Sequence, residues 1–413
     1  MNTHNTLLKA SALMLLSSIV LQQSLQADEM VAKRAPAAIQ APLPNLKPLT
    51  PKPGEAISQP KIEVVFVLDT TGSMSGLIKA AKEKIWSIAG TMAQANTAPQ
   101  IKMGLVGYRD RGDAYITQSI DLSDDLDSMY SRLMDFRANG GGDGPESVNQ
   151  ALYDAVHKMS WNHEQGTYKV IFLVGDAPAH MDYQDDVQYP ETIKIAKDKG
   201  IIINAIQSGS NRHATKNWKH IAKLGQGHFF RVENSGNAVA IDTPYDEELA
   251  DLSSKMDRTR IYYGNAQEKQ KQQAKVAAST KLHREASKAS QARRATYNAS
   301  VSGKSNFLGE KELVDEVASG GVALESIETE ALPEEMKTMK PAAREDFVKE
   351  KAKDRKKLRI EIKALADKRD AYLRQKVEEA GLGKSTLDSQ IFDAIKEQSA
   401  DKGLVYDKKN MKY

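Results

Sequence analysis

The sequence contains no cysteine, which excludes disulfide bonds, thiolate zinc sites, cysteine nucleophiles and the lipid-bearing cysteine of a bacterial lipoprotein. Aromatic residues make up only 6% of the chain and the mean hydropathy is −0.53, so much of the protein must be solvated. An excess of charge is also missing, because 58 basic residues face 55 acidic ones, and we predict no nucleic-acid partner. What is present is 413 residues, 40% of them hydrophobic, which is enough for more than one domain.

Long hydrophobic runs are scarce, and only the N-terminus has one that indicates membrane targeting. Lys9 precedes an apolar stretch at residues 10–21, which is shorter than the roughly 20 residues that a membrane-spanning helix needs. Residues 24–27 then end in alanine, as signal peptidase prefers. We predict a signal peptide at residues 1–27 that is cleaved before Asp28, with an uncleaved anchor as the alternative. Export without cysteine is typical of a periplasmic or secreted bacterial protein.

Residues 28–60 hold seven of the fourteen prolines and show no periodicity, so they are predicted to form a Pro-rich linker. After the linker, short apolar runs alternate with segments of helical period up to about residue 260. This alternation predicts an α/β fold with a doubly wound, mainly parallel sheet flanked by helices over residues 61–260. We expect strands at 62–68, 101–108, 115–122, 169–174, 201–206 and 228–232, the third at an edge, and helices at 75–95, 126–136, from Pro145 onward, 191–199 and 214–224.

Beyond residue 261 the composition changes to Ala, Gln, Lys and Glu without strand-like runs, which predicts a helical hairpin or small bundle over residues 265–413. Residues 343–380 carry apolar side chains at heptad-like spacing, typical of a coiled coil, although Arg369 and Lys376 interrupt the seam. A last helix is predicted from Ser385, capped through Asp388, to Gly403. The expected apolar positions are Ala274, Ala277, Leu282, Ala286 and Ala289 in residues 267–294, and Leu387, Ile391, Phe392 and Ile395 in the last helix.

Three loops that follow predicted strands are rich in oxygen-bearing side chains. The first contains Asp69, Thr71 and Ser73, the second is the glycine-rich stretch 140–146 with Asp143, and the third begins at Asp176. Ligands of open α/β sheets bind where the carboxyl ends of the strands meet. Hydroxyl and carboxylate oxygens without sulfur suit a hard divalent cation, Mg²⁺ or Ca²⁺.

The pattern Asp69-x-Thr71-x-Ser73, followed by a glycine-rich second loop and by Asp176, resembles the metal-ion-dependent adhesion site of von Willebrand factor type A domains. The resemblance covers residues 60–258. The stretches 106–113, 141–146 and 176–180 are closer to the subgroup found beside alpha-type protein kinases, but nothing after residue 261 resembles a kinase.

The resemblance implies that Thr71 and Ser73 bind the cation directly, while Asp69 and Asp176 act through water or by orienting ligands. Asp143 stands where the best-known adhesive members carry threonine. A further carboxylate would offset the charge of the ion, so we expect tighter metal binding and weaker capture of an acidic partner residue; a simple helix-capping role is the alternative. Residues beside the ligands, predicted to contact the partner, are Ser75, Gly142, Glu146 and Asp110.

The resemblance implies a non-catalytic binding protein that uses a divalent cation to engage a protein partner, and the predicted signal peptide implies that this protein is exported. One alternative is a structural envelope protein whose metal only stabilises the fold. A metal-dependent hydrolase is the other, but no general base stands out beside the ligands.

Two further motifs have both a functional and a structural interpretation. Residues 267–294 carry eight basic side chains and could bind an anionic envelope surface, or they could be solvated and balanced by the acidic segment 310–335. His180 with Asp182, Asp185 and Asp186 could form a second metal cluster or a solvated acidic loop. The oligomeric state does not follow from the sequence.

Overall fold

The computed structural model describes residues 59–142, 144–232, 241–381 and 387–407, all within one unit, Ser58–Tyr413. The predicted signal peptide and nearly all of the predicted linker lie outside the described residues, as does Asp143. None of the helices among the described residues is both long enough and apolar enough to cross a membrane.

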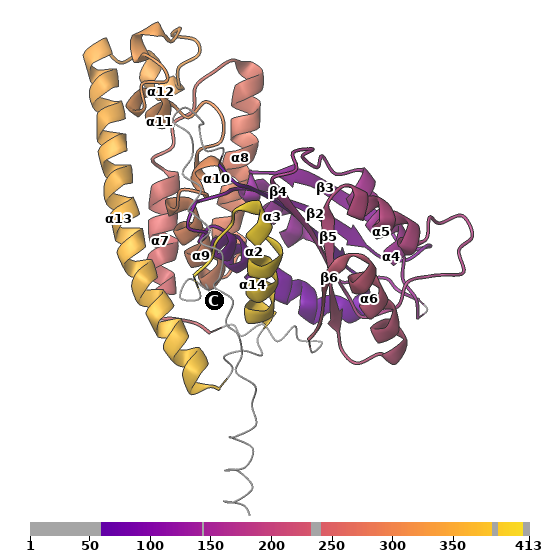
Figure 1. The fold of residues 1–413 in the computed structure, drawn as a ribbon. Coiled ribbons are helices and arrows are strands. Elements are labelled where there is room, and N and C mark those ends of the chain that lie inside the picture. Colours follow the sequence, from indigo (N-terminus) through magenta and orange to yellow (C-terminus); the bar gives the residue numbers. More distant parts are fainter. Residues whose placement is uncertain (1–58, 143, 233–240, 382–386, 408–413) are drawn as a thin grey trace, which may run out of the picture. The chain divides into compact units, whose positions relative to one another are not determined.

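A six-stranded sheet in the order β3-β2-β1-β4-β5-β6 organises the first part of the chain, as Figure 1 shows. β3 pairs antiparallel with β2 at one edge, and all other pairs are parallel. The doubly wound fold and the antiparallel edge strand predicted from the sequence are therefore confirmed. The strands are β1 (Lys61–Asp69), β2 (Gln100–Tyr108), β3 (Thr117–Ser123), β4 (Thr167–Gly175), β5 (Ile201–Ser208) and β6 (Gln226–Val232).

Both faces of the sheet are covered, which explains the nearly unbroken apolar runs of β1 and β4. Val64 and Phe66 of β1 point to one side and belong to the core shared with α2 (Ser75–Met92) and α3 (Leu126–Asp135). Val65 and Val67 point to the other side, where α4 (Val148–His157), α5 (Tyr189–Asp198) and α6 (Arg212–Leu224) pack. These helices agree with the predicted ones within a few residues, except at the start of α4.

The prediction that Pro145 opens a helix is wrong. α4 begins at Val148, and Glu146 instead forms an isolated parallel bridge with Ala179. The Glu146 amide donates to the Pro178 carbonyl at 2.9 Å, and the His180 amide donates to the Glu146 carbonyl at 3.1 Å. This pairing holds the backbone of Glu146 in register with the loop after β4, so helical geometry starts only after it.

The second part of the chain is helical and contains α7 (Asp246–Asp257), α8 (Ala266–Glu285), α9 (Lys288–Ala299), α10 (Lys304–Leu308), α11 (Leu313–Ala318), α12 (Glu334–Lys337) and α13 (Pro341–Glu379). α13 packs on α7, α9 and α11. Its Ile362 and Leu365 are buried as expected. Arg369 does not interrupt the seam but is itself buried, because its Nε donates to Asp246 Oδ1 at 2.6 Å.

Leu282 and Ala289 are buried as predicted, but the first half of α8 packs through a different face. Ala274 and Ala277 are exposed, whereas Gln272, Lys275 and Ser279 are buried. Polar side chains face inward here because each has a partner: Lys275 Nζ lies 2.7 Å from Asp125 Oδ1, and Gln272 Nε2 donates to the Tyr263 carbonyl at 3.0 Å. A pattern that counts only apolar residues cannot detect such a face.

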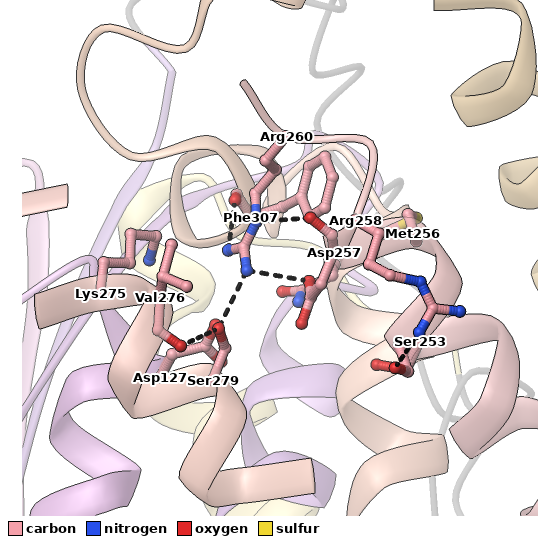
Figure 2. A network of polar contacts seen from close by, with 12 residues as sticks. Asp127, Ser253, Met256, Asp257, Arg258, Arg260, Lys275, Val276, Ser279 and Phe307 are labelled. Atoms are coloured by element: carbon pink, nitrogen blue, oxygen red, sulfur yellow. Dashed lines mark hydrogen bonds and ion pairs between the residues drawn. The ribbon is translucent and has the colours of Figure 1, made fainter. Parts of the chain in front are cut away.

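A buried ion cluster joins α3 to the helical part. Arg294 of α9 and Asp127 of α3 have no exposed surface, and the Arg294 Nε donates to Asp127 Oδ1 at 2.6 Å. Arg294 Nη1 also lies 2.9 Å from Asp257 Oδ2. Figure 2 shows Arg260 directed towards Asp257, Ser279 and the Phe307 carbonyl in the same cluster.

This cluster corrects the interpretation of residues 267–294 as a solvated basic face. Lys275, Arg293 and Arg294 are buried. The carboxylates beside the basic residues come from α2, α3 and α7 and include Glu83, Asp125 and Asp135, rather than from the segment 310–335. Lys275, Arg293 and Arg294 therefore fasten the helical part to α2 and α3, whereas Lys271, Arg284 and Lys288 are exposed.

The last helix, α14 (Leu387–Gln398), returns to the sheet and packs on α2 and β6, so it does not join the helices before it in one bundle (Figure 1). Ile391, Phe392 and Ile395 are buried there, as predicted, in the same core as α2. The Tyr406 hydroxyl donates to the Met92 carbonyl at 3.1 Å. The predicted cap at Ser385 and the side chains of Leu387 and Asp388 lie outside the described residues.

Candidate metal centre at the carboxyl edge of the sheet

The three oxygen-rich loops meet at the edge where β1 and β4 end. These strands are adjacent and parallel, with Leu68 opposite Val174, so Asp69 and Asp176 follow neighbouring strand ends. The first and second loops are joined through the backbone, because the Gly72 amide donates to the Gly140 carbonyl at 3.1 Å. A Cβ on Gly72 would lie 3.2 Å from that carbonyl oxygen, so the close approach favours glycine.

Asp69 organises the first loop. Its Oδ1 accepts hydrogen bonds from the Thr71 amide at 2.9 Å and from the Thr71 hydroxyl at 2.6 Å. The Thr71 and Ser73 hydroxyl oxygens lie 3.4 Å apart, and Ser73 is exposed. Asp69 Oδ2 is buried without a hydrogen-bond partner among the described residues. Burial, chiefly, raises the pKa of Asp69 to about 7.

Glu146 adds a second buried carboxylate to this edge. It is 4% exposed, and its Oε2 has no hydrogen-bond partner within the described ranges. Burial, followed by the charges of Asp69, Asp110 and Asp176, raises the pKa of Glu146 to about 9. Several acidic groups therefore repel one another across a small region, and no basic side chain is recorded as a partner of the Glu146 carboxylate in the part described.

A shallow cavity of about 320 Å³ opens at this edge. Ser73, Glu146 and Asp176, from three different loops, all line it. Its far wall is the loop after β5, residues 208–211, which the sequence analysis did not select. The available signal was the polar run Ser208-Gly-Ser-Asn211 after a strand that pairs with β4, since parallel strands end at a common edge.

The predicted partner-contacting residues occupy different positions. Ser75 and Gly142 are exposed but do not line the cavity, and Glu146 does. Asp110 is buried, contrary to a contact role, because it accepts the Ser147 hydroxyl at 2.9 Å and faces His180 Nε2 at 3.3 Å.

The acidic loop after β4 is not a second metal cluster in this structure. Arg111 lies 2.9 Å from Asp185 and 2.5 Å from Asp186, and its guanidinium stacks over the Tyr183 ring at 4.1 Å. His180 Nδ1 lies 2.8 Å from Asp182 Oδ1. These contacts bind the loop to the segment after β2.

Comparison with known proteins places this geometry in a family, because residues 63–235 match the family model described as von Willebrand factor A domain. Residues 63–235 are a von Willebrand factor A domain. The chain is similar to the alpha-protein kinase vwkA of Dictyostelium discoideum, 28% identical over 120 residues. It is also similar to a putative ariadne-like RING finger protein of Acanthamoeba polyphaga mimivirus, 27% identical over 123 residues.

These alignments cover 29% and 30% of this chain but only 19% and 12% of the two relatives. Among solved structures, the SpRpn10 von Willebrand factor A domain has a TM-score of 0.33 and 16% identity, covering 43% of this chain and 89% of that one. Proximal thread matrix protein 1 from the mussel byssus, with a zinc-occupied adhesion motif, has a TM-score of 0.34 and 15% identity, with 42% of each chain covered. Von Willebrand factor A domains are typically interaction modules without catalysis.

The residues at the edge of this domain fit a hard divalent cation. Asp69 Oδ2 and Glu146 Oε2 are buried oxygen atoms without partners, and the Thr71 and Ser73 hydroxyls lie in the same loop as Asp69. Among the described residues, no three carboxylate or imidazole groups make a metal site by themselves. A site here therefore requires the hydroxyl oxygens as ligands, which suits Mg²⁺ or Ca²⁺.

Proposed function

We propose that this protein binds a divalent cation, Mg²⁺ or Ca²⁺, at the carboxyl edge of its von Willebrand factor A domain and uses it to engage a protein partner. Thr71 and Ser73 would hold the ion through their hydroxyls, and Asp69 and Asp176 would orient the ligands or bind through water, with Asp143 as a further carboxylate. The observation that carries the proposal is the pair of buried, unpartnered carboxylate oxygens on Asp69 and Glu146. In their ionised form such groups are costly unless a cation neutralises their charge.

When bound, the ion supplies an electrophilic centre for an oxygen atom of the partner. The residues of the chain do the rest: Asp69 fixes the Thr71 hydroxyl by a 2.6 Å hydrogen bond, and Ser73, Glu146 and Asp176 line the cavity into which a partner group would enter. No side chain at this edge is assigned a catalytic step.

Metal binding is tested by calorimetric titration of the full chain with Mg²⁺ and with Ca²⁺. Ser73→Ala removes one proposed ligand and is expected to weaken binding at least tenfold, because charge-dipole ligands to an ion contribute more than a neutral hydrogen bond. Ser75→Ala is the matched control, since this exposed hydroxyl two residues later does not line the cavity. Failure of both ions to bind the wild type, or equal loss in the two variants, would refute the site.

A second candidate is a cation that only stabilises the fold. It is favoured by the number of acids around Glu146, because Asp69, Asp110, Asp176 and Asp113 all raise its pKa and would leave the ion little residual charge for a partner. Affinity capture separates the two functions. A partner retained by the wild type with the cation, but lost with a chelator and with Ser73→Ala, supports adhesion, and a partner retained under all conditions supports a stabilising ion.

We also propose that the protein is exported, from the apolar segment 10–21 and the small-residue ending at Ala27. Mass spectrometry of the protein recovered outside the cytoplasm of a bacterial host is expected to give an N-terminus at Asp28. Recovery only from the cytoplasm, with residues 1–27 intact, would contradict export.

A further inference from the structure

A second cavity, of about 580 Å³, lies between α9, α11 and α13. It shares no lining residue with the cavity at the proposed metal site. Gln94, just after α2, also lines it, so the cavity borders the von Willebrand factor A domain. Its size is within the range of small-molecule sites, which is about 300–1,000 Å³.

The cavity has an apolar wall and an apolar mouth. Val314 and Ile362 line it and are buried, whereas Val301 and Ile360 line it with 71% and 62% of their surface exposed. Exposed large aliphatic side chains at the mouth of a cavity are unfavourable in water and mark a surface that an apolar ligand can cover. No aromatic side chain is among the described residues that line it, so nothing there would stack on a planar ring.

One arginine that lines this cavity has a buried nitrogen without a hydrogen-bond partner among the described residues. Arg355 is satisfied, because its guanidinium lies 2.7 Å from Glu312 Oε1 and donates to Glu312 Oε2 at 2.9 Å. Arg359, one turn later on α13, has a buried Nε with no hydrogen-bond partner among the described residues. Burial, chiefly, and then the charge of Arg355 lower the pKa of Arg359, against the smaller opposing effect of the Asp315 and Glu312 carboxylates.

The other charged side chains at the rim of the cavity also favour an anionic ligand. Lys356 and Lys363 line the cavity and are exposed. Of the two acids in the lining, Asp315 is paired with Lys304 at 3.0 Å, which leaves Asp367 as the other negative group.

We propose that this cavity binds an amphiphilic anion with a single acyl chain, whose carboxylate pairs with Arg359 and whose hydrocarbon lies along Val314 and Ile362. A small inorganic anion would leave the apolar wall uncovered, and an uncharged hydrocarbon would leave Arg359 unmatched. The combination of wall and cation specifies both halves of the ligand.

The test is calorimetric titration of the full chain with dodecanoate below its critical micelle concentration. Arg359→Gln keeps the length and polarity of the side chain but removes the charge, and it is expected to weaken binding about tenfold or more. Arg374→Gln is the matched control, because Arg374 is an exposed arginine on α13 outside the cavity. Dodecanol is expected to bind the wild type and Arg359→Gln equally weakly.

The hydrocarbon half is tested separately. Decanoate is expected to bind more weakly than dodecanoate, because each buried methylene contributes about fourfold in affinity. Ala318→Trp, at the exposed rim on α11, should block dodecanoate while leaving the helical circular dichroism spectrum unchanged. The proposal is overturned if dodecanoate does not bind, if Arg359→Gln and Arg374→Gln bind it alike, or if acetate competes as well as dodecanoate. None of these results depends on whether a metal ion binds at the proposed metal site.

Discussion

Asp69 and Glu146 at the sheet edge, and Asp127 and Asp257 between α3 and α7, are all largely withdrawn from water, but their neighbours differ. Burial alone would raise the pKa of each carboxyl group. At the sheet edge, the hydrogen bonds from Thr71 lower the pKa of Asp69 less than burial raises it, and the pKa values of Asp69 and Glu146 rise to about 7 and about 9. We call the buried cluster of Asp127, Asp257 and Arg294 the junction. There the positive charge of Arg294, joined for Asp257 by Arg260, outweighs burial, and the pKa values of Asp127 and Asp257 lie below the ordinary value.

The difference separates a structural cluster from a binding site. Arg294, joined by Arg260, supplies positive charge to these two carboxylates from within the chain, so the ion pairs of this cluster form without an added ion. The sheet edge contains the acids without the cation. Its stability therefore depends on the solution, and an ion added from outside can be bound there.

The largest effect is expected from removing the charge at the junction. Arg294→Leu leaves Asp127 and Asp257 buried without their main partner and should lower the free energy of unfolding by about 3–5 kcal/mol, measured by urea denaturation. Arg284→Leu is the control, since Arg284 is 70% exposed and pairs only with its neighbour Glu285. A loss below about 1 kcal/mol for Arg294→Leu would show that Arg294 does not stabilise its buried carboxylates. The contrast between the junction and the sheet edge would then be wrong.

A divalent cation should compensate the sheet edge and not the junction. At a free concentration one hundred times its Kd, Mg²⁺ or Ca²⁺ should add about 2.7 kcal/mol to the free energy of unfolding of the wild type. Arg294→Leu should gain the same increment while keeping its deficit, and Ser73→Ala should gain much less. Chemical denaturation with and without chelator measures all three; equal gains in Ser73→Ala and the wild type would contradict the assignment.

Without metal, the sheet edge should also respond to pH. The folded state binds the Glu146 proton more tightly than the unfolded chain, whose carboxyl titrates near 4.5, so the stabilising contribution is present below that pH and is lost as pH rises towards about 9. Glu146→Gln cannot titrate. In chelator it should match the wild type near pH 4 and exceed its stability at pH 9 by several kcal/mol, because each unit of pKa difference corresponds to about 1.4 kcal/mol.

The matched measurement is Asp127→Asn, which alters the junction instead. Because the pKa of Asp127 is depressed, its contribution is present above the unfolded pKa and is lost only as pH falls through the folded value. This variant should be less stable than the wild type at neutral pH, opposite in sign to Glu146→Gln. If both variants changed the free energy of unfolding in the same direction, the distinction between the junction and the sheet edge would be wrong.

The smallest effect is expected for a pair that faces solvent, between α8 and α3. Lys281 Nζ lies 2.6 Å from Asp135 Oδ1, but the side chains are 21% and 60% exposed. Lys281→Ala should therefore change the free energy of unfolding by less than about 1 kcal/mol, and the change should shrink in 1 M salt. A larger loss would mean that surface pairs, and not only the buried Arg294 of α9, fasten the helical part to α3.

Local patterns predicted most of this structure correctly. Apolar runs that are buried on both faces identify β1 and β4 without ambiguity, and the order of strands and helices predicts the carboxyl edge where Asp69, Glu146 and Asp176 gather. The errors have a common origin in long-range partners. Pro145 has the local signature of a helix start, but Glu146 pairs with Ala179 across the chain.

The same reason explains the helical part. The local sequence predicts that Lys275 is solvated. In the fold it is buried, because Asp125, which is distant in the sequence, lies beside it. The loop at residues 208–211 was missed because its side chains matter only through the neighbouring strand β4. Whether Asp143 belongs to the metal site lies beyond the described residues.

The position of α14 has a consequence for synthesis of the chain. β6 ends at Val232, but the side chains that cover this side of the sheet beside α2 begin at Ile391. At roughly 5–20 residues per second, a ribosome needs on the order of ten to thirty seconds to reach them. Throughout that interval an apolar part of the sheet surface is exposed to water in the nascent chain. A chain that terminates before residue 387 would leave this surface exposed permanently.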